Sequence, residues 1–150
     1  MVGWGGNNGS TLTAALIANR KKLFWEKREG TQTANFFGSL VLASTLRLGV
    51  DSQNKEVCVP FKEILPMVDP CNIVVGGWDI SRMNLADSMD RAKVLDPDLK
   101  RQVRSEMERL VPLPSIYYPD FIAANQTDRA DNVLKGTKAE HLAILRSDIR

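Results

Sequence analysis

The hydrophobic and polar positions in the first third of the chain predict two helices separated by a polar loop. A helix is expected to begin at Ser10, after the glycine-rich segment 3–9, because the apolar positions that follow repeat with a helical period. A polar stretch over 26–33 leads to a second helical pattern over 34–48. Gly49 should end that helix, since glycine readily adopts the left-handed conformation that follows a helix.

Short apolar runs between these polar segments indicate strands. Residues 56–59 form one such run, and 116–118 form another. The best candidate for a buried strand is 72–75, which leads into Gly76-Gly77-Trp78-Asp79. Helices that alternate with short apolar strands predict an α/β fold with a mostly parallel sheet and flanking helices.

The second half of the chain contains clear helix start signals. Asn84 should cap one helix, and Asp96-Pro97 should start another over 99–110, which 111–114 interrupts with two prolines. Thr137 and Glu140 have the spacing of a capping box. In the helix over 99–110, the residues expected to face inward are Val103, Met107 and Leu110. In the helix that Thr137 starts, they are Leu142, Leu145 and Ile149.

Both ends of the chain are expected to be truncations of a longer protein. Only Met1 and Val2 precede the glycine segment, whereas a strand that supports such a loop typically has about five or six residues. At the other end, the helix that Thr137 starts continues to the last residue without a stop signal.

Composition indicates an ordinary globular domain. Of the 150 residues, 43% are hydrophobic and 25% are charged, which makes disorder and membrane classes unfavourable. A net charge of +2 does not favour a nucleic-acid or anionic-membrane partner. Cys58 and Cys71 have no metal or redox spacing, and the single histidine, His141, excludes a His-pair metal site. Without a signal peptide, the expected location is cytoplasmic.

The glycine segment has the chemistry of a phosphate-binding loop. Glycines at 3, 5, 6 and 9 let the backbone turn tightly and approach a ligand, and the N–H groups at the start of the next helix attract phosphate. The match to G-x-G-x-x-G is imperfect, because Asn8 stands at the third glycine position. No lysine follows Gly9, which excludes a P-loop. A flexible glycine turn is the alternative.

A ribose-binding acid would be the second sign of a dinucleotide site. The usual spacing of about twenty residues points to Glu26 or Glu29, but neither follows a strand. Asp79 does follow the strand predicted at 72–75, at the carboxyl end where open α/β sheets bind ligands. A turn residue or helix cap explains Asp79 equally well.

Several longer motifs resemble the eukaryotic myo-inositol-1-phosphate synthase family over nearly the whole chain. In order, they are GWGGNNGST, NFFGSL, LPMV, GGWDIS, MNLADSM, RAKVLD, VPLPSIYYPDFIAANQ, RADN and KGT. The resemblance implies that 1–150 is part of a Rossmann-like NAD-binding domain. It also implies that the family's catalytic, tetramer-forming domain is absent from this chain.

The resemblance further implies an activity. The family enzyme converts D-glucose 6-phosphate to 1D-myo-inositol 3-phosphate through oxidation at C5, enolisation, an intramolecular aldol closure and reduction by the same NAD. It is therefore an isomerase, and it acts in inositol and phospholipid biosynthesis. The family enzyme is also a homotetramer. Its catalytic lysines match nothing here, and Lys135 and Lys138 are better explained as solvated charges, so no catalytic residue is assigned.

Matched position by position, the resemblance implies a set of NAD contacts. The backbone of the glycine loop would surround the pyrophosphate, and Asp79 would contact the adenosine portion. Without the resemblance, Gln126 and Arg129 would be interpreted as a loop amide and a surface ion pair. The implied residues are Gly5, Gly6, Asn7, Asn8, Asp79, Ser115, Ile116, Gln126 and Arg129.

Two other functions are consistent with part of the pattern. The chain could be a truncated, catalytically inactive isoform that binds NAD or full-length subunits. It could also belong to another sugar-phosphate dehydrogenase that shares only the loop, although the extended GGWDIS and FIAANQ motifs disfavour this.

Overall fold

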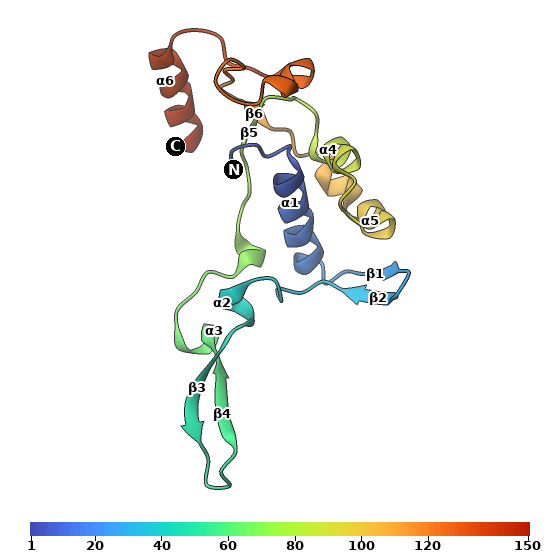
Figure 1. Cartoon of the computed structure of the whole chain (residues 1–150), viewed down its shortest axis with the longest axis vertical. Coiled ribbons are helices and arrows are strands. Elements are labelled where there is room, and N and C mark those ends of the chain that lie inside the picture. The colour runs from blue at the N-terminus through green and yellow to red at the C-terminus, as the bar shows by residue number, and fades with distance from the viewer. The chain divides into compact units, whose positions relative to one another are not determined.

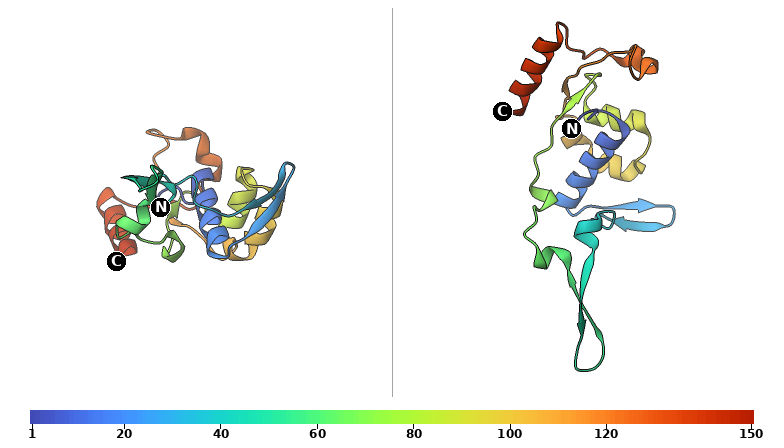
Figure 2. Two further views of the ribbon diagram at one scale, coloured as in Figure 1. Left: turned by 90° about the horizontal axis from the view of Figure 1, so that it is seen from below. Right: turned by 60° about the vertical axis from the view of Figure 1, so that its left-hand side comes forward.

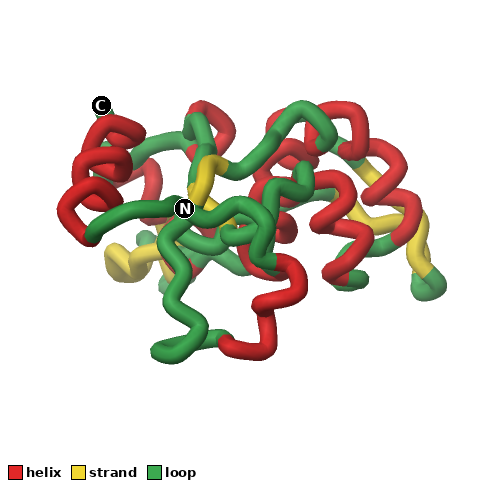
Figure 3. The backbone as a smooth tube through the Cα atoms, turned by 90° about the horizontal axis from the view of Figure 1, so that it is seen from above, coloured by secondary structure: helices red, strands yellow, loops and turns green.

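The computed structural model describes the backbone of residues 1–150 and their side chains except those of Leu40 and Val41. The chain forms two compact units (Figure 1). Unit 1 comprises residues 1–15 and 75–150, and unit 2 comprises residues 16–74. Figure 3 shows that helices and strands alternate with long loops throughout the chain.

Unit 1 is built from helices and very short strands. It contains α1 up to Ala15, and the glycine loop leads directly into this helix. Its elements are α1 (Asn7–Arg20, which continues into unit 2), β5 (Trp78–Asp79), α4 (Leu85–Ala92), α5 (Pro97–Met107), β6 (Leu113–Pro114), the 3-10 helix η2 (Ala124–Arg129) and α6 (Lys138–Ile149).

The strand pairing in unit 1 is parallel. β5 pairs with β6 in the register Trp78↔Leu113 and Asp79↔Pro114. Two isolated parallel bridges, Val2↔Trp78 and Ser115↔Val133, flank this pair. The segment that precedes the glycine loop therefore lies beside β5. This pairing places the loop next to Asp79.

Two helices, α4 and α5, lie side by side and supply most of the unit 1 core (Figures 1 and 2). The expected start signals are confirmed: the Asn84 side chain accepts a hydrogen bond from the Asp87 N–H at 2.9 Å, and Pro97 opens α5. Of the residues expected to face inward, Val103 and Met107 are buried and Leu110 is half-buried. The other buried apolar residues of this pair are Leu85, Ala86, Met89 and Leu99.

Unit 2 consists of two antiparallel hairpins and short helical turns. The hairpins are visible as the paired arrows β1–β2 and β3–β4 in Figures 1 and 2. The elements are β1 (Phe24–Lys27), β2 (Gly30–Thr33), α2 (Leu40–Ala43), β3 (Thr45–Val50), β4 (Glu56–Pro60), α3 (Phe61–Ile64) and the 3-10 helix η1 (Pro70–Asn72).

The helix predicted over 34–48 is wrong. Only Leu40–Ala43 is helical, and Thr45–Val50 is a strand that pairs with β4 over most of its length. Gly49 lies in this strand at φ +147°, beside a register shift, and does not end a helix. The apolar residues of 45–50 fit both periods, and hairpin partners at 56–60 select the extended form. The Leu40 and Val41 side chains, which belonged to the expected helix face, lie outside the described part.

Other elements also differ from the expectation. The polar stretch 26–33 lies entirely within the β1–β2 hairpin and is not simply a loop. Residues 72–75 form no buried strand, because Val74 is 95% exposed and the strand starts at Trp78. No strand forms at 116–118. The strand in this region is β6, which lies within 111–114, the segment that was expected only to end the preceding helix. A mostly parallel sheet is not seen either, since two of the three described strand pairs are antiparallel hairpins.

The last helix forms as expected but does not bury the expected face. The Thr137 side chain and the Glu140 side chain make both hydrogen bonds of the capping box. Leu142 and Ile149 are nevertheless 50% and 73% exposed, and His141 is the buried residue of this helix. Capping depends on local sequence, whereas burial of a helix face needs a partner.

Candidate functional site

The glycine loop is a tight turn fixed by backbone hydrogen bonds. Gly3 has φ +72°, a conformation that favours glycine. The N–H groups of Gly3 and Trp4 donate to the Trp78 carbonyl at 2.9 and 3.0 Å, and the Gly6 N–H donates to the Gly3 carbonyl at 2.9 Å. The turn is therefore attached directly to β5.

Helix α1 begins at Asn7, three residues earlier than the sequence suggests. The Ser10 N–H donates to the Gly6 carbonyl at 3.0 Å. The N–H groups of Asn7, Asn8 and Gly9 precede it in the first turn and have no acceptor within the helix. Asn7 and Asn8 are exposed, and no acidic side chain lies in this turn. These N–H groups and the positive end of the helix dipole are available to an anion.

Gly9 performs the packing role of the displaced third glycine. A Cβ atom on Gly9 would lie 2.1 Å from the Trp4 carbonyl oxygen, so no other residue fits without backbone movement. The Trp4 indole N–H donates to the Thr13 hydroxyl at 2.9 Å and fastens the loop to the helix. The asparagine at position 8 is accommodated because the close helix contact falls one residue later.

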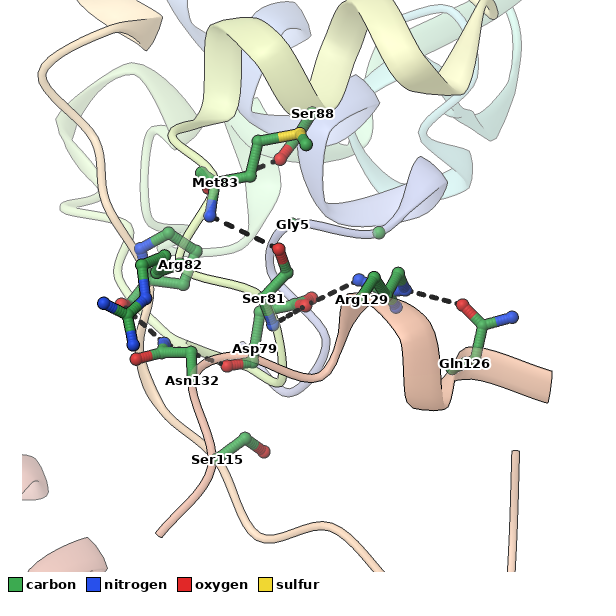
Figure 4. A network of polar contacts seen from close by, with 12 residues as sticks. Gly5, Asp79, Ser81, Arg82, Met83, Ser88, Ser115, Gln126, Arg129 and Asn132 are labelled. Atoms are coloured by element: carbon green, nitrogen blue, oxygen red, sulfur yellow. Dashed lines mark hydrogen bonds and ion pairs between the residues drawn. The ribbon is translucent and has the colours of Figure 1, made fainter. Parts of the chain in front are cut away.

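Asp79 lies beside this loop and is almost completely buried, with 1% of its surface exposed. Its Oδ1 atom accepts hydrogen bonds from the Ser81 N–H at 3.0 Å and from Arg129 Nη1 at 2.9 Å (Figure 4). Its Oδ2 atom is buried and has no hydrogen-bond partner among the described residues. A buried carboxylate oxygen without a donor is costly, so Asp79 Oδ2 has the capacity to accept a hydrogen bond from a water molecule or a ligand.

The Gln126 side chain, which lies on the 3-10 helix η2 together with Arg129, orients the Arg129 guanidinium. Gln126 Oε1 accepts a hydrogen bond from Arg129 Nε at 2.5 Å, and the guanidinium then reaches Asp79 (Figure 4). The bond from the Ser81 N–H confirms the turn interpretation of Asp79, and the ion pair with Arg129 is a second contact of the same carboxylate. Arg129 therefore does not form a surface ion pair, because the side chain of its partner Asp79 is only 1% exposed.

Gly5 brings the loop and Asp79 into contact. A Cβ atom on Gly5 would lie 3.2 Å from Asp79 Cγ and 3.3 Å from Ser88 Oγ. The Gly5 carbonyl accepts a hydrogen bond from Arg91 Nη2 at 2.6 Å. Ser88 and Arg91 were not singled out by the sequence, and only their spacing of three residues on one helix face could have suggested them.

Ser115 and Ile116 lie farther from this network. The Ser115 N–H donates to the Asn132 carbonyl at 3.0 Å, and Asn132 Nδ2 donates to the Asp79 carbonyl at 3.1 Å. Ser115 is thus linked to Asp79 through Asn132, another residue that sequence reasoning missed (Figure 4). Ile116 is half-buried, and its carbonyl accepts from the Ser115 hydroxyl at 3.3 Å.

The arrangement can hold a phosphorylated ligand with a hydroxyl-bearing group nearby. Free N–H groups at the start of α1 suit phosphate oxygens, and Asp79 Oδ2 suits a ribose hydroxyl. In the described part of the chain, no cluster of three His, Cys, Asp or Glu residues could hold a metal ion. No described helix is long and apolar enough to cross a membrane.

Comparisons with known proteins agree with this geometry. The sequence model described as Myo-inositol-1-phosphate synthase matches residues 1–150. The inositol-3-phosphate synthase of Drosophila melanogaster is 59% identical over all 150 residues, which cover 26% of that protein. Inositol-3-phosphate synthase 1 of Oryza sativa subsp. japonica is 57% identical over the same residues, which cover 29% of it.

A solved structure extends the comparison to three dimensions. The crystal structure of inositol-3-phosphate synthase from Caenorhabditis elegans matches with a TM-score of 0.95 and 51% identity. The match covers 99% of this chain and 30% of that one. The chain therefore belongs to the myo-inositol-1-phosphate synthase family, and the matching sequence model is one of NAD binding.

Proposed function

We propose that the full-length protein is an NAD-dependent isomerase that converts D-glucose 6-phosphate to 1D-myo-inositol 3-phosphate, and that this chain holds the cofactor. Family membership supports the reaction. The observation that carries the cofactor role is the contact between the glycine loop and the buried Asp79 carboxylate, whose Oδ2 atom has no partner among the described residues.

Different residues of the site bind different parts of the cofactor. The backbone at Gly5, Gly6, Asn7 and Asn8 surrounds the pyrophosphate, with the first turn of α1 as the main donor of hydrogen bonds. Asp79 accepts a hydrogen bond from a hydroxyl of the adenosine ribose. The remaining cofactor contacts are assigned to Ser115, Ile116, Gln126 and Arg129.

NAD held by these residues would supply a hydride acceptor and, once reduced, a hydride donor, which is consistent with a net isomerisation. The contribution of this chain is to bind and orient the cofactor. The groups that move protons during enolisation and aldol closure belong to the part of the protein that this chain does not cover. The same proposal holds that the rest of the protein contacts glucose 6-phosphate. It also holds that the full-length protein is a homotetramer in the cytoplasm.

The short parallel pairs are proposed to be part of a larger, mostly parallel sheet in the full-length protein. Val2, β5 and β6 are adjacent parallel segments, and Ser115 extends the pairing to Val133. A typical sheet has longer strands, which residues beyond this chain would supply.

The test is a turnover assay with the purified full-length protein, glucose 6-phosphate and NAD. We expect inositol phosphate to form without net consumption of NAD. Binding of NAD without turnover of this sugar phosphate would contradict the reaction. Failure to bind NAD in a calorimetric titration would contradict the cofactor role as well.

A further inference from the structure

We infer that Arg91 of α4 is a positioning residue for cofactor binding, which fixes the glycine loop and adds a positive charge to the pyrophosphate site. This inference rests on the proposed function, because it concerns the same cofactor.

The first observation is the hydrogen bond between Arg91 and the loop. Arg91 Nη2 donates to the Gly5 carbonyl at 2.6 Å, across a sequence separation of 86 residues. A guanidinium donor makes a charge-assisted bond, which is shorter and stronger than a neutral one. The bond fixes the plane of the peptide that joins Gly5 to Gly6, and α1 begins one residue later.

The second observation is that one face of α4 lies close to Gly5, with Arg91 bonded to its carbonyl and Ser88 in the space that a side chain would need. Ser88 is 1% exposed, and its Oγ atom would lie 3.3 Å from a Cβ on Gly5. Arg91 follows three residues later on the same helix face. The helix that carries both residues is capped by Asn84 at its start and ends at Lys93 in the left-handed conformation, with φ 55°. The two contacts therefore come from a well-defined element.

The third observation concerns charge. Asp79 is a buried carboxylate that repels a pyrophosphate, and its ion pair with Arg129 at 2.9 Å offsets this charge. Arg91 donates to the Gly5 carbonyl and forms no ion pair with any carboxylate whose side chain the structure describes. The pair and Arg91 together leave one net positive charge beside the loop, which suits a ligand with two negative charges.

The test uses the full-length protein with Arg91→Met and Arg91→Lys. We expect Arg91→Met to weaken NAD binding about tenfold in calorimetric titration, equivalent to about 1.4 kcal/mol. The KM for NAD should rise in proportion, while kcat and the KM for glucose 6-phosphate stay within about twofold. Arg91→Lys should keep the dependence of NAD affinity on salt, and Arg91→Met should reduce it, because only the lysine retains the charge.

Arg101→Met is the matched control. Arg101 lies on α5, and its side chain is 79% exposed and paired with Asp98. NAD affinity should not change in this variant. If Arg91→Met does not fold, Arg91→Gln takes its place with the same expected loss of salt dependence.

The outcomes separate this inference from the proposed function. Equal NAD affinity and equal salt dependence in Arg91→Met and the unsubstituted protein would overturn the role of Arg91 alone. Binding of NAD by the unsubstituted protein without isomerisation would overturn only the reaction. Absence of NAD binding by the unsubstituted protein would overturn both.

Discussion

Single glycines in and beside the loop are constrained by how closely other groups approach them. At Gly9 the Trp4 carbonyl occupies the space of a side chain, and at Gly77 the Met1 carbonyl does the same at 2.1 Å. At Gly5 the neighbours are side chains at 3.2 to 3.3 Å. Substitution at Gly9 should therefore affect folding, whereas substitution at Gly5 should act mainly on the contact with Asp79.

Gly9→Ala should destabilise the protein by about 2–3 kcal/mol, in the upper range for overpacking, because the backbone of Trp4 would have to move. Thermal unfolding measures this change. Gly76→Ala is the control, since a Cβ there would meet nothing within 4 Å. Equal unfolding temperatures for the two variants would contradict the packing role of Gly9.

Asp79→Asn should weaken NAD binding by about 1.5–3 kcal/mol, the range for a hydrogen bond to a charged group. NADP should lose less affinity than NAD, because the substitution removes a negative charge that repels the 2′-phosphate. Parallel titrations with the two cofactors measure the ratio. A proportional loss for both cofactors would show that Asp79 does not face the ribose.

At the scale of elements, α4 and α5 are joined by a network of charges around Asp90. Its carboxylate accepts hydrogen bonds from Lys100 at 2.8 Å and from Arg104 at 2.6 Å. Hydrogen bonds from Lys100 and then from Arg104 hold the pKa of Asp90 below its ordinary value. The network therefore joins α4, which carries Ser88 and Arg91, to α5, which carries the core residue Val103.

Asp90→Asn should cost no more than about 1 kcal/mol, because the side chain is 42% exposed and solvent screens the pairs. A lowered pKa stabilises the fold above the ordinary aspartate value of about 3.9, and this contribution is lost as the pH falls through the folded value. The stability difference between parent and variant should therefore shrink in urea unfolding below about pH 4, and also in 1 M salt. A difference that stays constant with pH would contradict this role.

Thr137→Ala should destabilise α6 by about 1 kcal/mol, since it removes the side chain that accepts the Glu140 N–H bond. Hydrogen exchange of the α6 amides measures the local effect. Thr137→Ser keeps the hydroxyl and serves as the control. If both variants exchange equally fast, the capping box does not stabilise the helix.

At the scale of the whole molecule, the chain spans only 26–30% of the relatives that it matches. Large apolar side chains are exposed in both units, including Phe37 at 83%, Val74 at 95% and Phe121 at 86%. Apolar exposure on this scale is unusual for a complete soluble domain. The remaining part of the protein, or further subunits, is expected to cover these residues.

This expectation can be measured with a dye that fluoresces on apolar surfaces. The 150-residue chain should bind the dye, and the full-length protein should bind much less per molecule. Phe121→Ser should lower the signal of the short chain, whereas Thr127→Ser, at an exposed polar position in the same region, should not. Equal dye binding by the short and full-length chains would contradict burial in the larger protein.

The sequence by itself determined the features that depend on neighbouring residues. The caps at Asn84 and Thr137 and the start of α5 at Pro97 were correct, because the groups involved lie within one turn of a helix. The glycine loop and the extended motifs identified the family, because the order of residues carries that information directly.

Only the tertiary structure decided the features that depend on distant residues. Antiparallel partners converted 45–50 into a strand, and the contact with Trp4 showed why Gly9 must be glycine. The Asp79–Arg129 pair joins residues 50 positions apart, and the Arg91–Gly5 bond joins residues 86 apart. Such pairs form only after the chain has folded, and for this reason local periodicity and spacing do not reveal them.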